Sequence, residues 1–159
     1  MRTLVAHGVR FVVIGGFAGS LRGSPVITGD LDICYARDRQ NLEGLAEALR
    51  ELGAHLRGPG VPEDLPFQLD PETFELGDRF TFITAGGKLD VMGVPSGTRG
   101  FDDLDAGADT LEVDGLEARV ASLDDLIAMK EAARRDKDMI HLEWLRSLRD
   151  MIDRGDVPT

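Results

Sequence analysis

The chain contains three aspartates whose apolar neighbours predict that they lie on strands. Asp30 and Asp32 alternate with Leu31 and Ile33, so both carboxylates would project from one face of a strand while the apolar side chains turn into the core. Asp90 lies between two apolar residues of a second strand-like run. Carboxylates that share a small volume repel each other unless a cation lies between them, and their hard oxygen atoms suit Mg²⁺. We therefore predict a carboxylate site for Mg²⁺, with two ions about 4 Å apart.

A glycine pair is the second chemical feature. Gly15 and Gly16 end the apolar run 9–14, as at a buried strand that stops in a tight turn. Glycines let the backbone approach phosphate oxygens, and the N-terminus of a following helix adds N–H donors and a favourable dipole. Together with the carboxylates they predict a site for a metal-bound nucleoside triphosphate. Each motif also has a simpler interpretation: a turn for Gly-Gly, a solvated edge for Asp-x-Asp, and the polar face of a hairpin for Asp90.

Several runs have the composition of strands that would position these residues. The run 9–14 is β-branched and apolar, and 30–35 alternates polar and apolar residues. Runs 79–84 and 88–92 flank a glycine turn and predict a hairpin that carries the third aspartate. The segment 111–120 predicts a further strand pair.

The sequence predicts four helices. Apolar positions from Leu42 recur at i, i+3, i+4 and i+7, and Gly53 lies where a C-terminal cap is expected. A short helix is predicted from residues 17–21. Ser122, with an acidic residue three positions later, predicts the start of a third helix, and a last helix should end by Gly155.

These elements predict an α/β (α+β) fold with a mixed sheet flanked by helices and a C-terminal helical segment. We expect residues 1–121 to form the core and residues 122–159 to form helices packed on it, within one structural domain. The proline- and glycine-rich stretch 57–71 and the Gly- and Asp-rich stretch 97–109 are predicted to be connections.

Composition narrows the class of protein. The 159 residues include 29 acidic and 18 basic ones, and the net charge of −11 is opposite in sign to that of a protein that coats long nucleic acid. The single Cys34 excludes an internal disulfide, and three scattered histidines lack the spacing of a zinc site. No apolar run is long enough to span a bilayer and the first eight residues do not form a signal peptide, so we expect a soluble, cytoplasmic protein without a membrane partner.

The order and spacing of the motifs resemble the signature of the nucleotidyltransferase superfamily, in its polymerase-beta-like minimal members. The sequence has apolar-Gly-Gly, thirteen residues, Asp-apolar-Asp-apolar and a later apolar-Asp-apolar. This resemblance implies a Mg²⁺-dependent enzyme that moves a nucleoside monophosphate from a nucleoside triphosphate to an acceptor hydroxyl and releases pyrophosphate. It implies that Asp30, Asp32 and Asp90 are the metal ligands and catalytic residues, with Asp90 helping to deprotonate the acceptor. The nucleotide-binding residues implied near the N-terminus are Gly15, Gly16, Ser20 and Thr28.

Further motifs resemble a small bacterial subgroup that includes the AbiEii-type toxins of abortive-infection toxin–antitoxin systems. These motifs are Gly-Phe-Ala at 16–18, Gly-Ser-Pro at 23–25 and Thr-Gly-Asp-Leu-Asp at 28–32. Members of the subgroup also carry a lysine, an arginine and a Lys-Asp pair near the C-terminus. By this resemblance Lys130, Arg134 and Asp138 belong to the nucleotide site, and a cognate antitoxin is a partner. A simpler interpretation of Lys130 is a surface lysine on an amphipathic helix.

The acceptor stays open between a tRNA, a protein and a small molecule such as an antibiotic. The acidic net charge favours a protein or a small molecule, because RNA requires a basic surface. The alternative is a local basic groove lined by Arg22, Lys88, Arg99, Lys130, Arg134, Arg135 and Lys137.

Two other classes of function remain. A non-catalytic nucleotide-binding or interaction module would keep the fold and the site without turnover. Val26 favours this class, because relatives commonly have an arginine two residues before the threonine, at this position. A carboxylate metal site of purely structural use would leave the glycine pair unexplained.

Overall fold

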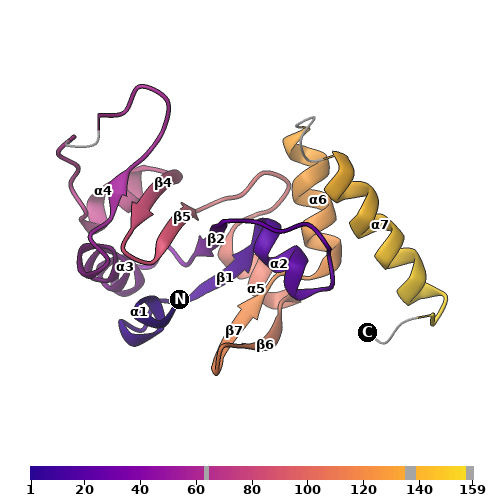
Figure 1. Cartoon of the computed structure of the whole chain (residues 1–159). Coiled ribbons are helices and arrows are strands. Elements are labelled where there is room, and N and C mark those ends of the chain that lie inside the picture. Colours follow the sequence, from indigo (N-terminus) through magenta and orange to yellow (C-terminus); the bar gives the residue numbers. More distant parts are fainter. Residues whose placement is uncertain (63–64, 135–138, 157–159) are drawn as a thin grey trace.

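A single mixed sheet organises the protein (Figure 1). The computed structural model describes residues 1–62, 65–134 and 139–156, and seven strands lie within these ranges in the order β3-β4-β5-β2-β1-β7-β6. Strand β1 is antiparallel to β2 and parallel to β7, and β2 is parallel to β5. The predicted fold class is therefore confirmed. The strands are β1 (Phe11–Ile14), β2 (Asp30–Tyr35), β3 (His55–Leu56), β4 (Arg79–Thr84), β5 (Gly87–Met92), β6 (Asp109–Val113) and β7 (Leu116–Val120).

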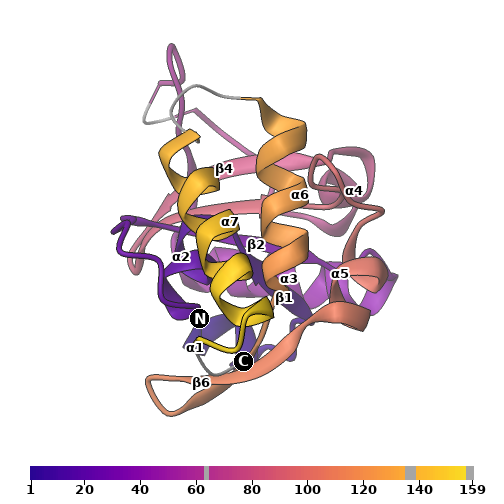
Figure 2. The same cartoon turned by 90° about the vertical axis from the view of Figure 1, so that its right-hand side faces the viewer.

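Helices flank this sheet at both ends. Figure 1 shows α3 and α4 at the β4 end and α6 and α7 at the opposite end, and Figure 2 shows α6 and α7 side by side. Helix α6 packs against α7 and also against α2, so the C-terminal pair lies next to the first helix after β1. The helices are α1 (Arg2–Ala6), α2 (Gly15–Leu21), α3 (Arg39–Glu51), α4 (Pro71–Leu76), α5 (Phe101–Gly107), α6 (Leu123–Ala133) and α7 (Met139–Asp153).

Aromatic residues pack one face of the sheet. Phe74 of α4 lies edge-on to Phe80 and Phe82 of β4, with ring centroids 5.1 and 6.5 Å apart. The hydroxyl of the fully buried Tyr35 donates to the Phe74 carbonyl at 3.0 Å. Because side chains alternate along a strand, this burial fixes the register and turns Thr81 to the opposite face.

The structure confirms the predicted strands and the longer helices, together with the expected end of α3 at Gly53 and the expected start of α6 at Ser122. Helix α3 begins after Asp38, whose carboxylate accepts a hydrogen bond from the Asn41 backbone N–H at 3.2 Å. Gly53 follows the end of this helix with φ +58°. Ser122 caps α6 by accepting the Asp125 amide hydrogen bond at 3.1 Å. These caps satisfy backbone groups that have no partner inside the helix.

Two predictions are wrong in detail. The stretch 97–109 is not only a connection, because it contains α5, whose Leu104 is fully buried. Gly15 and Gly16 do not precede the following helix but form its first two residues. Helices α1 and α4 and strand β3 were not predicted, because they have only two to six residues and such short elements show no hydrophobic period.

The division of the chain at residue 121 stays a prediction. None of the helices in the described part of the chain is long and apolar enough to cross a membrane.

Candidate functional site

The register of the sheet brings the three aspartates together. Asp32 of β2 pairs with Asp90 of the parallel strand β5, and Asp30 pairs with Lys88 one pleat away. On the other side of β2, Asp32 is opposite Ile14, the last residue of β1. All three aspartates line one cleft. The predicted geometry, two carboxylates on one strand face and a third on a neighbouring strand, is therefore present.

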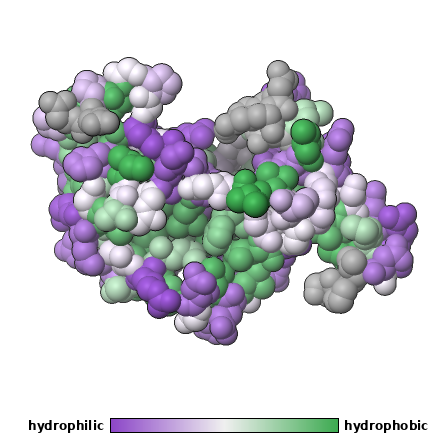
Figure 3. Space-filling model, viewed as in Figure 1, coloured by the Kyte–Doolittle hydropathy of each residue, from purple (hydrophilic) through white to green (hydrophobic). Residues whose placement is uncertain are grey.

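The cleft above this row has a volume of about 620 Å³. Its walls are the segments 26–28 and 57–59, together with residues of α6 from Leu126 to Ala133 and His141 near the start of α7. Figure 3 shows the molecule hollowed between its β4 side and its α6 side. Clefts of about 300–1,000 Å³ are the usual size for small-ligand sites.

Arg57 lies between two of the carboxylates. Its Nη2 is 3.1 Å from Asp30 Oδ2 and 2.9 Å from Asp90 Oδ1, and its Nε donates to the Phe82 carbonyl at 3.2 Å. Lys88 Nζ lies 3.7 Å from Asp30 Oδ1. The charges of Asp30 and Asp90 are thus balanced by basic side chains of the protein itself.

Asp32 has a different electrostatic environment. Burial is the largest cause of a rise in the pKa of this carboxyl to about 6, and the negative charges of Asp90 and Asp30 add to it. Arg79 and a hydrogen bond from the Gly16 backbone act in the opposite direction. A carboxyl whose pKa is raised by two neighbouring carboxylates marks a position where a cation would be stabilised.

Gly15 packs closely against Asp32 of β2, and Gly16 packs against Thr28, just before that strand. Gly15 has φ +67°, and a Cβ added to it would lie 2.2 Å from Asp32 Oδ2. A Cβ added to Gly16 would lie 3.1 Å from Thr28 Cβ. At position 15 the backbone is left-handed and lies against the Asp32 carboxylate, and only glycine meets both conditions without strain or overlap. The pair therefore places the first turn of α2 directly against the row of aspartates.

The segment before β2 is held by two hydroxyl groups. Ser20 Oγ donates to the Val26 carbonyl at 2.8 Å and to the Gly16 carbonyl at 3.2 Å, so it attaches this segment to α2, and Ser20 is not among the described residues that line the cleft. Thr28 does line the cleft, and its Oγ1 accepts the Asp30 backbone hydrogen bond at 3.3 Å. Val26 contributes an apolar wall.

The residues expected near the C-terminus separate in the structure. Lys130 of α6 lines the cleft. Arg134, in contrast, is the exposed C-cap of α6 with φ +48°, and it is not among the described cleft residues. The predictions for Arg135, Lys137 and Asp138 lie outside the residues that the structure describes.

The described basic residues do not form the single basic groove considered from the sequence. Arg22 donates to the Ala121 carbonyl at 2.6 Å and to Asp109 at 2.7 Å, which ties α2 to β6 and to the residue after β7. Arg99 pairs with Asp103 at 2.7 Å on the surface of α5. These two arginines therefore have local structural partners away from Asp30, Asp32 and Asp90.

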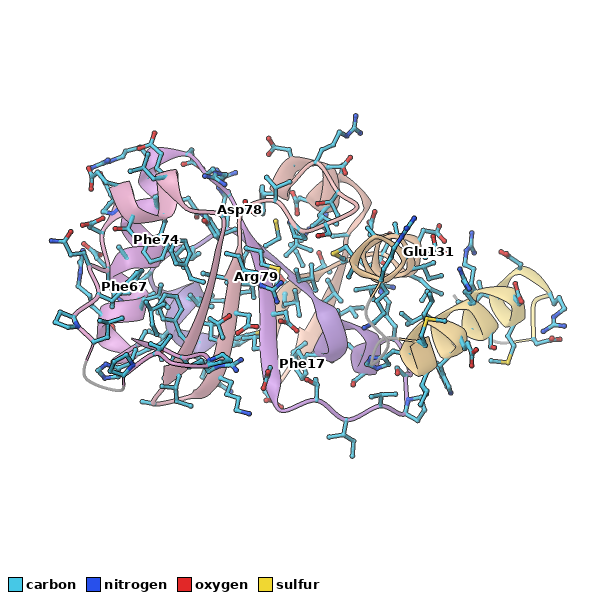
Figure 4. All side chains as sticks on the ribbon, turned by 90° about the horizontal axis from the view of Figure 1, so that it is seen from above. Phe17, Phe67, Phe74, Asp78, Arg79 and Glu131 are labelled. Carbon is cyan, nitrogen blue, oxygen red and sulfur yellow. The ribbon has the colours of Figure 1, made fainter. Side chains whose placement is uncertain are left out.

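Two basic residues of the cleft were not predicted. Arg79 begins β4 and alternates with Thr81, so its position on the cleft face follows from the strand pattern once the aspartate face is known. Figure 4 shows Arg79 between the sheet and α6, apart from Phe67 and Phe74 in the aromatic group. Arg57 follows the two-residue strand β3 and carries no comparable signal in the sequence.

The donor chemistry of the site fits a divalent cation. As the side chains stand, no three His, Cys, Asp or Glu residues within the described ranges form a ready metal cluster. Arg57 Nη2 lies between Asp30 and Asp90. The three carboxylates nevertheless face one cleft, and two of them raise the pKa of the third. Such an oxygen-only set suits Mg²⁺.

Comparisons with known proteins place this fold. No family model matches the sequence, and no curated protein matches it. The lincosamide antibiotic adenylyltransferase LnuA, solved with lincomycin bound, has a similar structure with TM-score 0.59 and 15% identity over 91% of this chain and 90% of that one. The antibiotic-resistance factor ANT(2'')-Ia gives TM-score 0.56 and 14% identity over 95% and 81%. A candidate nucleotidyltransferase from Thermotoga maritima gives TM-score 0.50 and 20% identity over 96% and 90%. The chain therefore has a fold found in nucleotidyltransferases.

Proposed function

We propose that the chain is a member of the nucleotidyltransferase superfamily that moves a nucleoside monophosphate from a nucleoside triphosphate to an acceptor hydroxyl, releasing pyrophosphate. The observation that carries this proposal is the row of Asp30, Asp32 and Asp90 along one cleft, with the first turn of α2 packed against it. The fold supports the proposal, but a fold hosts many functions, so the argument depends on the site.

The aspartates would hold Mg²⁺, and the proposed complex would contain two ions. The metal would supply Lewis-acid stabilisation of the triphosphate and of the leaving pyrophosphate. Asp90 would accept the proton of the acceptor hydroxyl on a carboxylate oxygen. Its side chain is 10% exposed, against 33% for Asp30, so it is the better shielded of the two from bulk water.

Basic side chains in the cleft would bind the triphosphate. Arg57, Arg79 and Lys130 line the cleft together with the three aspartates, so charges balance locally in a chain of net charge −11. Without these residues, the field of an acidic protein would repel an anionic substrate. Lys130 and Arg79 would donate hydrogen bonds to phosphate oxygens, where charge grows during transfer. The first turn of α2, at Gly15 and Gly16, would add backbone donors.

For the acceptor we propose a hydroxyl of a small molecule. The cleft has the size of a small-ligand site, and two structurally similar proteins are an antibiotic adenylyltransferase and an antibiotic-resistance factor. The resemblance of Lys130 and of the N-terminal motifs to AbiEii-type toxins makes a tRNA or protein acceptor, with a cognate antitoxin, the second candidate.

Pyrophosphate release and label transfer test this proposal. The protein is incubated with Mg²⁺, each of the four α-labelled nucleoside triphosphates and either cell extract or a panel of hydroxylated antibiotics. We expect a labelled product that disappears in Asp30→Asn and Asp32→Asn. Asp150→Asn, which removes an exposed carboxylate of α7, is the matched control and should retain full turnover. Undiminished transfer by both site variants would reject the assignment.

A nucleotide-binding module without turnover is the second candidate function. The ion pairs of Arg57 with Asp30 and Asp90 favour it, because they occupy carboxylates that catalysis requires. Calorimetry distinguishes the two candidates. Binding of Mg²⁺-nucleotide without any product, across the whole acceptor panel, would support the module.

A further inference from the structure

Arg57 is anchored to the edge of the sheet by contacts that do not involve the aspartates. Its backbone N–H donates to the Thr81 carbonyl at 2.9 Å, which extends the pairing of β3 with β4 by one residue. Its Nε donates to the Phe82 carbonyl at 3.2 Å. The base of the side chain is thus fixed at the wall of the cleft, and the end of the guanidinium reaches over the floor.

A single nitrogen of this guanidinium bridges the two carboxylates. Nη2 lies 3.1 Å from Asp30 Oδ2 and 2.9 Å from Asp90 Oδ1. The Arg57 side chain is 28% exposed and that of Asp90 is 10% exposed, so solvent screens the interaction less than it would at the surface. The bridging nitrogen occupies the space between oxygens that would both have to face a shared divalent cation.

We propose that Arg57 is a built-in counter-ion of the carboxylate site, which a divalent cation displaces, and that the displaced guanidinium then binds the phosphates of the incoming nucleotide. This inference rests on the proposed function, because it assumes that the aspartates hold a metal. Arg57 Nη2 and a divalent cation cannot both occupy the position between Asp30 Oδ2 and Asp90 Oδ1, since at such distances their repulsion is large. Arginine suits both partners, because its planar fork binds carboxylate and phosphate alike.

The consequence is a coupling between metal and nucleotide. Bare metal has to break the ion pairs of Arg57 without offering it another anion, so it binds weakly. A metal–triphosphate complex supplies that anion, so both ligands bind better together than separately, and the coupling is reciprocal. Arg57 would in this way reduce loading of the site by metal alone.

Calorimetry with two probes, bare Mn²⁺ and the preformed complex of Mn²⁺ with inorganic triphosphate, tests this counter-ion exchange. In Arg57→Met we expect bare Mn²⁺ to bind about tenfold more tightly and Mn²⁺-triphosphate about tenfold more weakly than in the wild type. Arg39→Met is the matched control, because it removes the same charge from an exposed arginine that pairs with Glu43 and Glu72. It should shift neither affinity appreciably.

Opposite shifts of the two affinities are the signature that a merely structural arginine would not produce. Shifts in the same direction, or no shift beyond that of Arg39→Met, would overturn the inference. Arg57→Lys keeps the charge but loses the fork, so it should give smaller shifts of the same signs, and it serves as the test if Arg57→Met does not fold. If Mn²⁺-triphosphate binds the wild type and not Asp32→Asn while the Arg57 variants change nothing, only this inference fails. If neither probe binds any of the proteins, the proposed metal–nucleotide site fails as well.

Discussion

Replacing Gly15 with alanine perturbs the contact that joins α2 to the row of aspartates. The new Cβ would lie 2.2 Å from Asp32 Oδ2 and 2.7 Å from its Cγ, and Gly15 has φ +67°. Two costs therefore add: about 1–2 kcal/mol for an L-residue in the left-handed region and about 1–3 kcal/mol for the steric overlap. We expect Gly15→Ala to lower the free energy of unfolding by about 2–5 kcal/mol.

Gly8 separates the two costs, because it has nearly the same positive φ without the overlap. Its φ is +66°, and a Cβ added to it meets nothing within 4 Å. Gly8→Ala should therefore show only the backbone cost of about 1–2 kcal/mol. The assay is urea unfolding followed by circular dichroism and by the fluorescence of Trp144, the only tryptophan. An equal loss of stability in both variants would refute the packing of Gly15 against the aspartate.

A double-mutant cycle identifies Asp32 as the partner. Asp32→Ala removes the two atoms nearest to the new methyl group and leaves only Asp32 Cβ, at 2.9 Å. The effect of Gly15→Ala should then be smaller by about 1 kcal/mol or more in the Asp32→Ala background. Strict additivity of the two substitutions would contradict this contact.

Three further predictions concern the rest of the fold. Cys34 is fully buried, and burial raises the pKa of its thiol to about 12. The thiol should therefore resist iodoacetamide in the native protein and react at the rate of global unfolding. Fast labelling of the native protein would contradict its burial. Glu51 accepts a hydrogen bond from His7, and this bond raises the pKa of the imidazole. The pair therefore stabilises the fold fully at pH values below the unfolded-state pKa of histidine. This stabilisation is lost as the pH rises through the folded-state pKa. In Glu51→Gln, NMR titration should give a lower pKa for His7, and the free energy of unfolding should depend less on pH; an unchanged titration would exclude the pair. Ser122→Ala should destabilise the protein by about 1 kcal/mol through loss of the α6 cap, and urea unfolding indistinguishable from the wild type would argue against that cap.

The aspartate geometry could be predicted because it depends on local alternation. Asp30 and Asp32 share a face in any strand, and the apolar neighbours of Asp90 place it on another strand. The pairing of Asp32 with Asp90 follows from a parallel β2–β5 contact. That contact is long-range, and the sequence offered only the resemblance to support it.

Arg57 and Arg79, two basic residues of the cleft, were not predicted from the sequence. Arg57 reaches the aspartates only because β3 pairs with β4 at the sheet edge, and a two-residue strand has no hydrophobic period. Ser20 was expected to face a nucleotide, but its hydroxyl attaches the segment before β2 to α2. Short hydroxyl side chains often bond to nearby backbone, and sequence spacing does not distinguish that role from ligand binding.

Nucleotidyl transfer is tested most directly by the position of the label in the substrate. Parallel reactions contain the same nucleoside triphosphate labelled at the α- or at the γ-phosphate, with Mg²⁺ and an acceptor mixture, for the wild type and for Asp32→Asn. Transfer of a nucleoside monophosphate predicts that the α-label moves to the acceptor, that the γ-label leaves as pyrophosphate, and that both events require Asp32. Transfer of the γ-label to the acceptor, or α-label transfer that persists in Asp32→Asn, would contradict the account.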